Sequence, residues 1–254
     1  EEPAIPFTAL NIMFSGGAAL DPPDKRGAAY MMTGLLDEGA GDLDSQAFAS
    51  AREALSASFS FDVSDDTLSI SVRLLTENRA EALALLKTAL IKPRFDAEAV
   101  ERVRQQVLSI LASNAQDPTD TAQRVWAEQA FGDHAYGASY QGTESSITAL
   151  TRSDLLAAHQ NLLVRDAVSI SAVGDITAEE LGPILDDLLG DLPAGSALET
   201  APLELDIPAG LTVVDMPTPQ SVAIFGHRGI DRADPDFFAA FILNTILGGQ
   251  GIES

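Results

Sequence analysis

Residues 11–41 read NIMFSGGAALDPPDKRGAAYMMTGLLDEGAG, and the same order of features returns at residues 222–249, which read VAIFGHRGIDRADPDFFAAFILNTILGG. Each stretch runs from an apolar strand through glycines and an Asp-Pro pair to an apolar helix and a glycine stop. The two stretches lie about 210 residues apart, and such self-similarity is typical of duplicated units. The sequence therefore predicts a repeated α+β unit, with a second strand expected at residues 222–225.

Three segments are expected to form the sheet of the first unit, namely Phe7–Phe14, Thr67–Leu74 and Val168–Val173. In the second of them, apolar residues alternate with serine and arginine, which is typical of an antiparallel strand with one buried face. We therefore expect one mostly antiparallel sheet with its helices packed on a single face. A second sheet of the same kind is expected to begin after about Leu205.

Helices are predicted where apolar residues recur at three- to four-residue spacing behind a capping residue. Trp126 is expected to face the core from one of these helices. The expected helices cover residues 27–37, 45–55, 78–91, 118–131 and 177–190, and two more follow Asp96 and Thr151.

The domain organisation follows from a change in composition. Residues 193–208 are rich in Pro, Gly, Ala and Ser and show no apolar period, so we interpret them as a linker. Residues 1–192 are then the first α+β domain, and residues 209–254 are the beginning of a second, similar domain that is cut short. We predict that the native chain is longer.

Composition narrows the classes of partner. The chain has 38 acidic and 15 basic residues, a net charge of −23, which disfavours nucleic acid and anionic membrane surfaces. It has no cysteine, so thiolate chemistry and disulfides are excluded. No apolar run reaches the roughly 18 residues of a membrane helix, so no membrane insertion is expected. No leader is visible before Glu1.

An ordered set of short motifs resembles the pitrilysin/insulinase family of zinc metallopeptidases, especially its bacterial two-subunit branch and the mitochondrial processing peptidases. Each motif is weak alone, but together they follow the family's order through almost the whole chain. The resemblance implies a fold of repeated α+β domains, in agreement with the repeat above. The motifs are residues 14–41, 101–118, 132–137, 142–144, 173–175 and 248–254.

Active members of that family carry an inverted zinc motif, H-x-x-E-H, and a distal Glu on a later helix. By this resemblance, Tyr30 stands for the first His, Thr33 for the Glu, Gly34 for the second His and Ile110 for the distal Glu. Gly34 and Ile110 offer no donor atom, and a threonine hydroxyl is a far weaker base than a carboxylate. We therefore predict no catalytic residue, no metal ligand and no zinc in this chain.

Other polar candidates favour structural roles. Asp37 and Glu38 are adjacent on a helix and diverge, so we interpret them as a solvated helix end rather than a metal site. His134, His159 and His227 are scattered singly, which predicts hydrogen-bonding or surface roles, with catalysis by His134 the less favoured alternative. No G-x-S-x-G elbow is present to anchor a serine triad.

Gly248, Gly249 and Gly251 form the remaining motif. The simplest interpretation is a helix C-cap and turn. The resemblance implies a second role, because a glycine-rich loop at this position of the non-catalytic processing-peptidase subunit handles substrate. We keep these three glycines as candidate substrate-binding residues.

The resemblance implies a non-catalytic homologue that closes a peptide-binding chamber as the partner of a zinc-bearing sibling, or as a homodimer, around an extended peptide. Zinc is then expected only in the partner subunit. One alternative is a scaffold subunit without a protease partner, like the core proteins of the respiratory bc1 complex. Another is a member classed by similarity as a zinc metalloendopeptidase. By analogy with bacterial relatives, the expected compartment is periplasmic or secreted.

Overall fold

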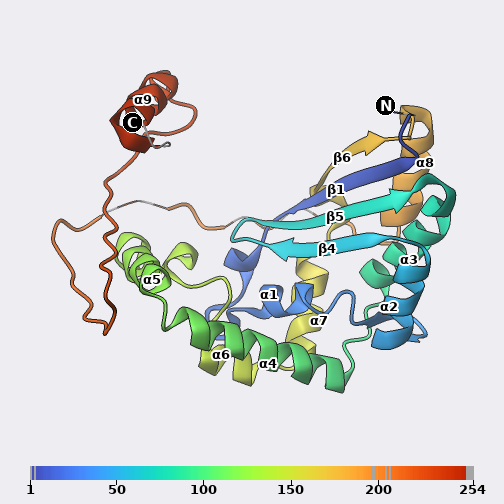
Figure 1. The fold of residues 1–254 in the computed structure, drawn as a ribbon, viewed down its shortest axis with the longest axis horizontal. Coiled ribbons are helices and arrows are strands. Elements are labelled where there is room, and N and C mark those ends of the chain that lie inside the picture. Colours follow the sequence, from blue (N-terminus) through green and yellow to red (C-terminus); the bar gives the residue numbers. More distant parts are fainter. Residues whose placement is uncertain are drawn as a thin grey trace.

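The computed structural model describes residues 2, 4–195, 198, 200–203, 205 and 207–249. Four strands form one fully antiparallel sheet in the order β4-β5-β1-β6 (Figure 1). Its strands are β1 (Phe7–Ser15), β4 (Ser58–Val63), β5 (Thr67–Leu75) and β6 (Val168–Gly174).

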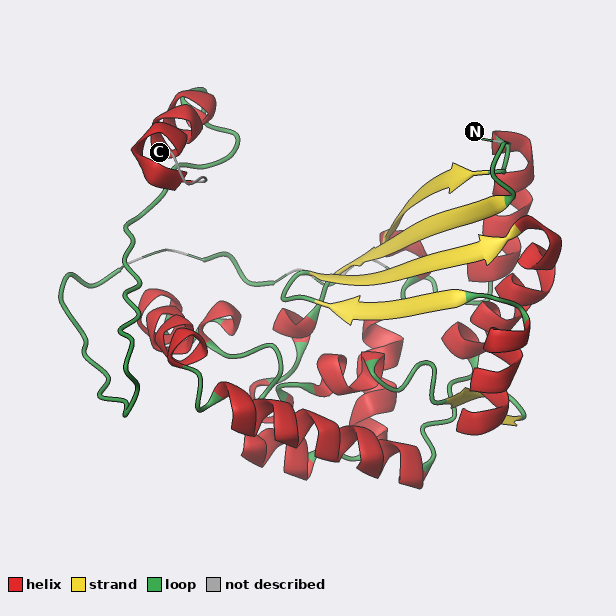
Figure 2. Cartoon of the chain, in the orientation of Figure 1, coloured by secondary structure: helices red, strands yellow, loops and turns green. Residues whose placement is uncertain are grey.

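The two faces of the sheet differ as the alternating sequence predicts. In β1, Leu10, Ile12 and Phe14 are buried against the helices, whereas Asn11 and Met13 point to the open face. Among the described residues, the helices of the first domain lie on one side of the sheet (Figure 2). The prediction of an α+β fold with one antiparallel sheet is confirmed.

Most helix starts follow from capping residues. Asp44 accepts a hydrogen bond from the backbone N–H of Ala47, and Thr151 and Thr177 form capping boxes. No described helix is long and apolar enough to cross a membrane. The helices are α1 (Ala28–Thr33), α2 (Ser45–Ala54), α3 (Arg79–Ile91), α4 (Ala97–Asn114), α5 (Pro118–Phe131), α6 (Glu144–Ala149), α7 (Arg152–Leu162), α8 (Ala178–Leu189) and α9 (Phe237–Asn244). Two short strands of two residues each, β2 (Gly39–Ala40) and β3 (Leu43–Asp44), pair antiparallel and form a small ribbon.

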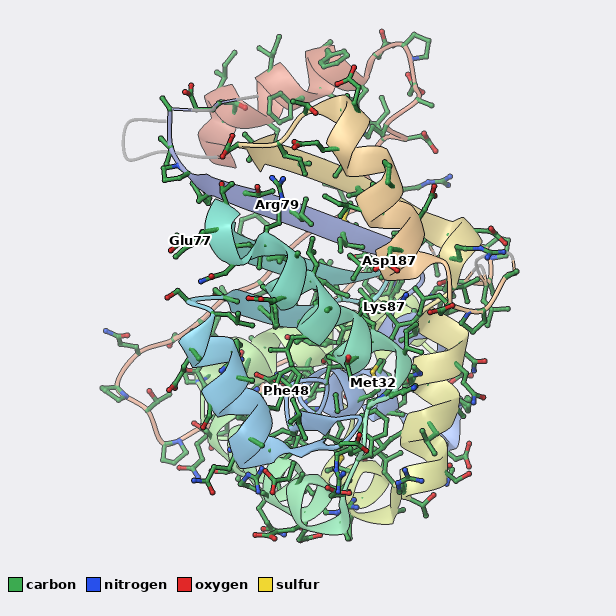
Figure 3. The ribbon with its side chains drawn as sticks, turned by 90° about the vertical axis from the view of Figure 1, so that its right-hand side faces the viewer. Met32, Phe48, Glu77, Arg79, Lys87 and Asp187 are labelled. Atoms are coloured by element: carbon green, nitrogen blue, oxygen red, sulfur yellow. The ribbon has the colours of Figure 1, made fainter. Side chains whose placement is uncertain are left out.

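The core lies between the sheet and this helical layer. Met32 of α1 and Phe48 of α2 are both fully buried within it (Figure 3). At the surface, Lys87 of α3 contacts Asp187 of α8 at 3.0 Å and so joins the two helices. Such an exposed pair adds little stability, so burial of apolar side chains holds the fold together.

One expectation about the first domain is wrong, and one strand of it was not expected. The helix predicted at residues 27–37 ends at Thr33. Beyond the C-cap Gly34, the N–H groups of Leu35, Leu36 and Glu38 bond three residues back, so the chain continues as turns up to β2. The strand β4 was not predicted at all, although residues 58–63 alternate Ser, Phe, Ser, Phe, Asp and Val before a Ser-Asp-Asp turn. That alternation is the signal that could have found it.

The strand expected at residues 222–225 is also absent, and residues 207–236 contain no strand or helix. A strand satisfies its N–H and C=O groups only through a neighbouring strand. No described residue offers such a neighbour to this segment. The helix of the repeat does form, as α9, so the second copy of the pattern is half realised. The domain boundaries 1–192, 193–208 and 209–254 stay a prediction.

Candidate functional site

The entry to α1 is organised by Asp21, which is buried. Its carboxylate accepts hydrogen bonds from the N–H groups of Gly27 at 3.0 Å and Ala29 at 3.2 Å. Burial raises the pKa of Asp21 to about 6, although these hydrogen bonds and nearby Arg26 favour the charged form. The Asp-Pro turn of the repeated pattern therefore fixes where α1 begins.

Tyr30, Thr33 and Gly34 lie on α1 and at its C-cap. The Thr33 hydroxyl is buried and donates to the Tyr30 carbonyl at 2.8 Å, so it is committed to the backbone. A Cβ atom placed on Gly34 would lie 3.3 Å from Cγ1 of Val103 on α4. This contact shows that α1 and α4 pack together where the resemblance places the two histidines.

Ile110 lies on α4, seven residues beyond Val103, and is 38% exposed. Seven residues correspond to about two helical turns. A zinc ion needs nitrogen, sulfur or carboxylate ligands. These positions supply none of them, because Ile110 carries a hydrocarbon side chain, Gly34 has no side chain, and the Thr33 hydroxyl is hydrogen-bonded to the backbone. These residues therefore do not form the zinc site that the resemblance implies for active members of the family.

A groove of about 920 Å³ opens on the surface of the first domain. It runs between the C-terminal half of α4, the helix α5 and the loop 136–144. Tyr140 lines it, and its ring meets that of Tyr30 edge to face at 5.6 Å. Tyr30 thus connects the position of the first family histidine to the groove wall.

The groove carries more negative than positive charge. Asp65, Asp120 and Glu144 line it, and its one arginine, Arg124, pairs with Glu128 at 2.8 Å. Burial and the neighbouring Asp66 raise the pKa of Asp65.

Tyr140, one of the two tyrosines that line the groove, is affected by the same charges. Burial raises the pKa of Tyr140, and Tyr30, Asp65 and Asp120 add to that rise. The negative charges of Asp65 and Asp120 are therefore both felt at Tyr140 in the groove. The sequence analysis missed this groove because its residues come from four separate segments, although the motifs 132–137 and 142–144 flank Tyr140.

Asp37 and Glu38 diverge as expected, but they are not merely solvated. Asp37 pairs with Arg52 at 2.8 Å, and Glu38 binds Arg102 and the hydroxyl of Ser45. Each carboxylate thus has its own partner on another element. Within the described residues, no group of three or more His, Asp or Glu side chains is placed to hold a metal ion.

The three histidines have different environments. His159 is buried and bonds the Leu90 carbonyl at 2.8 Å, and burial lowers its pKa. His134 accepts from the N–H of Tyr136 through Nδ1, so its Nε2 donates to the Ala201 carbonyl at 2.8 Å. His227 is exposed. These contacts are those of structural histidines.

The glycines beyond α9 are only partly described. Gly248 has a φ of 126°, which kinks the helical run Thr245–Gly249 at that residue. Gly251 lies outside the described residues. The role of Gly248, Gly249 and Gly251 in binding substrate stays a prediction.

Comparison with known families agrees with this fold. Residues 1–144 match the family described as Insulinase (Peptidase family M16), and residues 149–253 match the Peptidase M16 inactive domain. The chain belongs to peptidase family M16. The resemblance found in the sequence motifs is therefore confirmed.

Individual relatives differ in what they are called. The non-peptidase homolog YmxG of Helicobacter pylori is 26% identical over 250 residues, covering 98% of this chain and 58% of that protein. An uncharacterized zinc protease of Mycobacterium tuberculosis is 22% identical over 256 residues, covering 99% and 58%. A crystal structure of a peptidase M16 inactive domain from Pseudomonas fluorescens superposes with a TM-score of 0.81 at 28% identity, covering 98% and 61%. The chain thus spans about 58% of the length of these curated relatives.

Proposed function

We propose that this chain is a non-catalytic M16 subunit that works beside a zinc-bearing sibling and helps to enclose an extended peptide. One observation carries the proposal. The α1 turn that would hold the zinc ligands and the base is built from Tyr30, an engaged Thr33 hydroxyl and Gly34 against Val103. The names of the Helicobacter pylori homologue and of the Pseudomonas fluorescens domain support the same conclusion.

The sheet offers a means of holding a peptide. The strand β4 is the end strand of the order β4-β5-β1-β6, and among the described strands only β5 pairs with it. Its outer edge therefore presents N–H and C=O groups that an extended chain can bond. Because β4 contacts α1, a peptide on this edge would pass beside Tyr30 and the groove.

Zinc binding tests the inactive site directly. The purified, dialysed wild-type chain should retain far less than one zinc per molecule. The fourfold variant Tyr30→His, Thr33→Glu, Gly34→His and Ile110→Glu should bind zinc, since two histidines four residues apart share a helical face. The same variant without Ile110→Glu is the matched control and should bind more weakly. Stoichiometric zinc on the wild-type chain would contradict the proposal.

Partnership is tested by mixing and by co-purification. The wild-type chain alone should cleave no peptide, and it should raise the activity of a sibling that carries H-x-x-E-H. Two peptides test the mode of binding, one methylated on the odd-numbered backbone nitrogens and one on the even-numbered. Only one of the two should lose binding, because alternate N–H groups of a bound strand face β4 and the others point away. If native complexes contain no such sibling, the scaffold alternative is favoured instead.

The compartment is part of the same proposal. We infer a periplasmic or secreted location by analogy with bacterial members of the family. Fractionation of native cells tests it, since recovery with cytoplasmic markers would refute it.

A further inference from the structure

The turn that joins β4 to β5, residues 64–66, is held firmly by the backbone of another segment. The N–H groups of Gly16, Ala18 and Ala19, which follow β1, donate to its three carbonyl groups at 2.8 to 2.9 Å. The turn is therefore bonded through every one of its carbonyl groups, and it gives the strand β4 a fixed end.

The same turn borders the groove. Asp65 lines the groove and comes two residues after Val63, the last residue of β4. In Figure 1 the arrowhead of β4 points to the side of the molecule on which α5, one wall of the groove, lies. A peptide bonded along the outer edge of β4 and continued past Val63 would therefore enter the groove.

A side-chain hydrogen bond links this turn to the loop between α5 and α6. The hydroxyl of Tyr136 donates to Oδ1 of Asp66 at 2.7 Å. The ring of Tyr136 also meets the rings of Phe131 and His134 edge to face, with centroids 6.0 Å and 4.6 Å apart. The bond to Asp66, followed by burial, raises the pKa of Tyr136, so its hydroxyl stays a donor at neutral pH.

The loop that Tyr136 begins is a continuous wall of the groove, since every residue from 136 to 144 lines it. The far end of this wall is held separately, because Nδ2 of Asn114 on α4 donates to the side chain of Gln141 at 3.0 Å. Between these two points, the ring of Tyr140 contacts that of Tyr30. The wall is thus fixed to α4 at one end, and Tyr136 joins its other end to the sheet.

We propose that Tyr136 is a positioning residue that, through Asp66, sets the groove wall against the end of β4, so that edge and groove form one continuous site for a single extended peptide. The inference rests on the proposed function, since it prolongs the peptide held at the edge of β4. The ligand is then a segment longer than β4, which has six residues, and the part beyond Val63 lies in the groove.

The experiment measures the binding of synthetic peptides with blocked ends and a fluorescent label. The first is a hexamer of alternating valine and threonine, which matches the length of β4. The other two carry four further residues of alternating alanine and serine, one at the N-terminus and one at the C-terminus. Only the extension that passes Val63 should raise the affinity severalfold, because the other leads away from the groove.

Three variants test the link itself. Tyr136→Phe removes only the hydroxyl, and Asp66→Ala removes its acceptor, whereas Asp66→Asn keeps an acceptor oxygen and loses only the charge. Tyr136→Phe and Asp66→Ala should weaken binding of the favoured longer peptide roughly three- to tenfold and leave the hexamer unchanged. Asp66→Asn should bind both peptides like the wild type.

Amide hydrogen exchange reports on the wall without any peptide. The N–H groups of Gly137 and Ala138 bond carbonyl groups within the loop, so their exchange should quicken in Tyr136→Phe and Asp66→Ala but not in Asp66→Asn. Ser64→Ala is the matched control. It removes the contact of the Ser64 and Thr67 hydroxyls at 2.9 Å in the same turn, and it should match the wild type in both measurements.

An equal loss for the hexamer and the longer peptide, an effect of Ser64→Ala as large as that of Asp66→Ala, or unchanged exchange in Tyr136→Phe would each overturn the proposal. Loss of affinity in Asp66→Asn would do the same, because the charge rather than the hydrogen bond would then be the cause. If the hexamer binds but neither extension adds affinity, the continuity of edge and groove is refuted and the proposed function stands. If no peptide binds the wild-type chain, the proposed function fails and this inference with it.

Discussion

The two copies of the repeated pattern end in opposite environments. Phe14, which closes the strand of the first copy, has no exposed surface, whereas Phe225 at the same place in the second copy is 91% exposed. The Asp-Pro turns differ likewise, because Asp21 is buried and bonds α1, while Asp234 is exposed and bonds only the nearby N–H of Asp236. The same local sequence order therefore does not by itself produce the same structure.

The difference lies in the partners that each copy finds. The first strand has β5 on one side and β6 on the other, so every backbone group has a neighbour. Residues 222–225 have no such neighbours among the described residues. Local pattern sets a preference, and pairing with distant segments decides whether the preference is realised.

The largest expected effect is in the core. Phe14→Ala removes a fully buried aromatic ring and should lower the free energy of unfolding by about 3–5 kcal/mol. Phe225→Ala should change it by less than about 0.5 kcal/mol, because the ring is exposed. Urea denaturation of both variants measures the difference. Similar losses in the two would mean that the second copy is as well packed as the first.

The next effect concerns the Asp-Pro turn and depends on pH. Asp21 has a pKa of about 6 when folded against 3.8 when free, so between these values the folded state binds more protons. Its contribution to stability is full below about pH 4 and is lost as the pH rises through about 6, with a range of up to about 3 kcal/mol.

Asp21→Asn removes this titration and should therefore gain on the wild type between pH 4.5 and pH 7. Urea midpoints at several pH values measure the gain. Asp234→Asn, at the exposed counterpart, controls for the loss of one negative charge. A constant difference between Asp21→Asn and the wild type across this range would refute the assignment.

Much of the fold could be predicted because local sequence patterns determine many of its elements. The alternation in β5 and the capping residues of α2, α7 and α8 identify their elements without knowledge of the rest. The alternation of residues 58–63 indicates the strand β4 in the same way, although it was not predicted. The end of α1 at Thr33 has no such local signal, because its last turns are set by the ribbon that follows.

The site divides in the same way. Replacement at Tyr30, Thr33, Gly34 and Ile110 is visible once the family motif is aligned, since it is a matter of residue identity. The groove was not visible, because it joins segments that are distant in sequence. Trp126 illustrates the same point. Its spacing suits a core helix, but it is half-buried and lies outside the core cluster, so the expectation that it faces the core is wrong.

A smaller effect is expected at one glycine of each copy, Gly17 after Phe14 and Gly229 after Phe225. A Cβ atom on Gly17 would lie 2.2 Å from the carbonyl oxygen of Ser64, whereas Gly229 has open space. Gly17→Ala should therefore cost about 1–3 kcal/mol through overpacking, and Gly229→Ala less than about 0.5 kcal/mol. Thermal unfolding of the two variants tests this. A well-tolerated Gly17→Ala would show that the turn beside β5 can shift.

The smallest effect is expected from the histidines, one in each region. His159 is buried and neutral, with Nε2–H donating to the Leu90 carbonyl, and burial holds its pKa below the usual value of about 6.5. As the pH falls below about 6.5, the unfolded chain takes up a proton that the folded chain resists, so stability is lost on acidification. This direction is opposite to that of Asp21. His159→Gln keeps a side-chain N–H donor but cannot titrate, so its unfolding free energy should fall less than that of the wild type between pH 7.5 and pH 5.5. His227→Gln, at an exposed position, is the control, and an equal change in both variants would show that burial of His159 is not the cause.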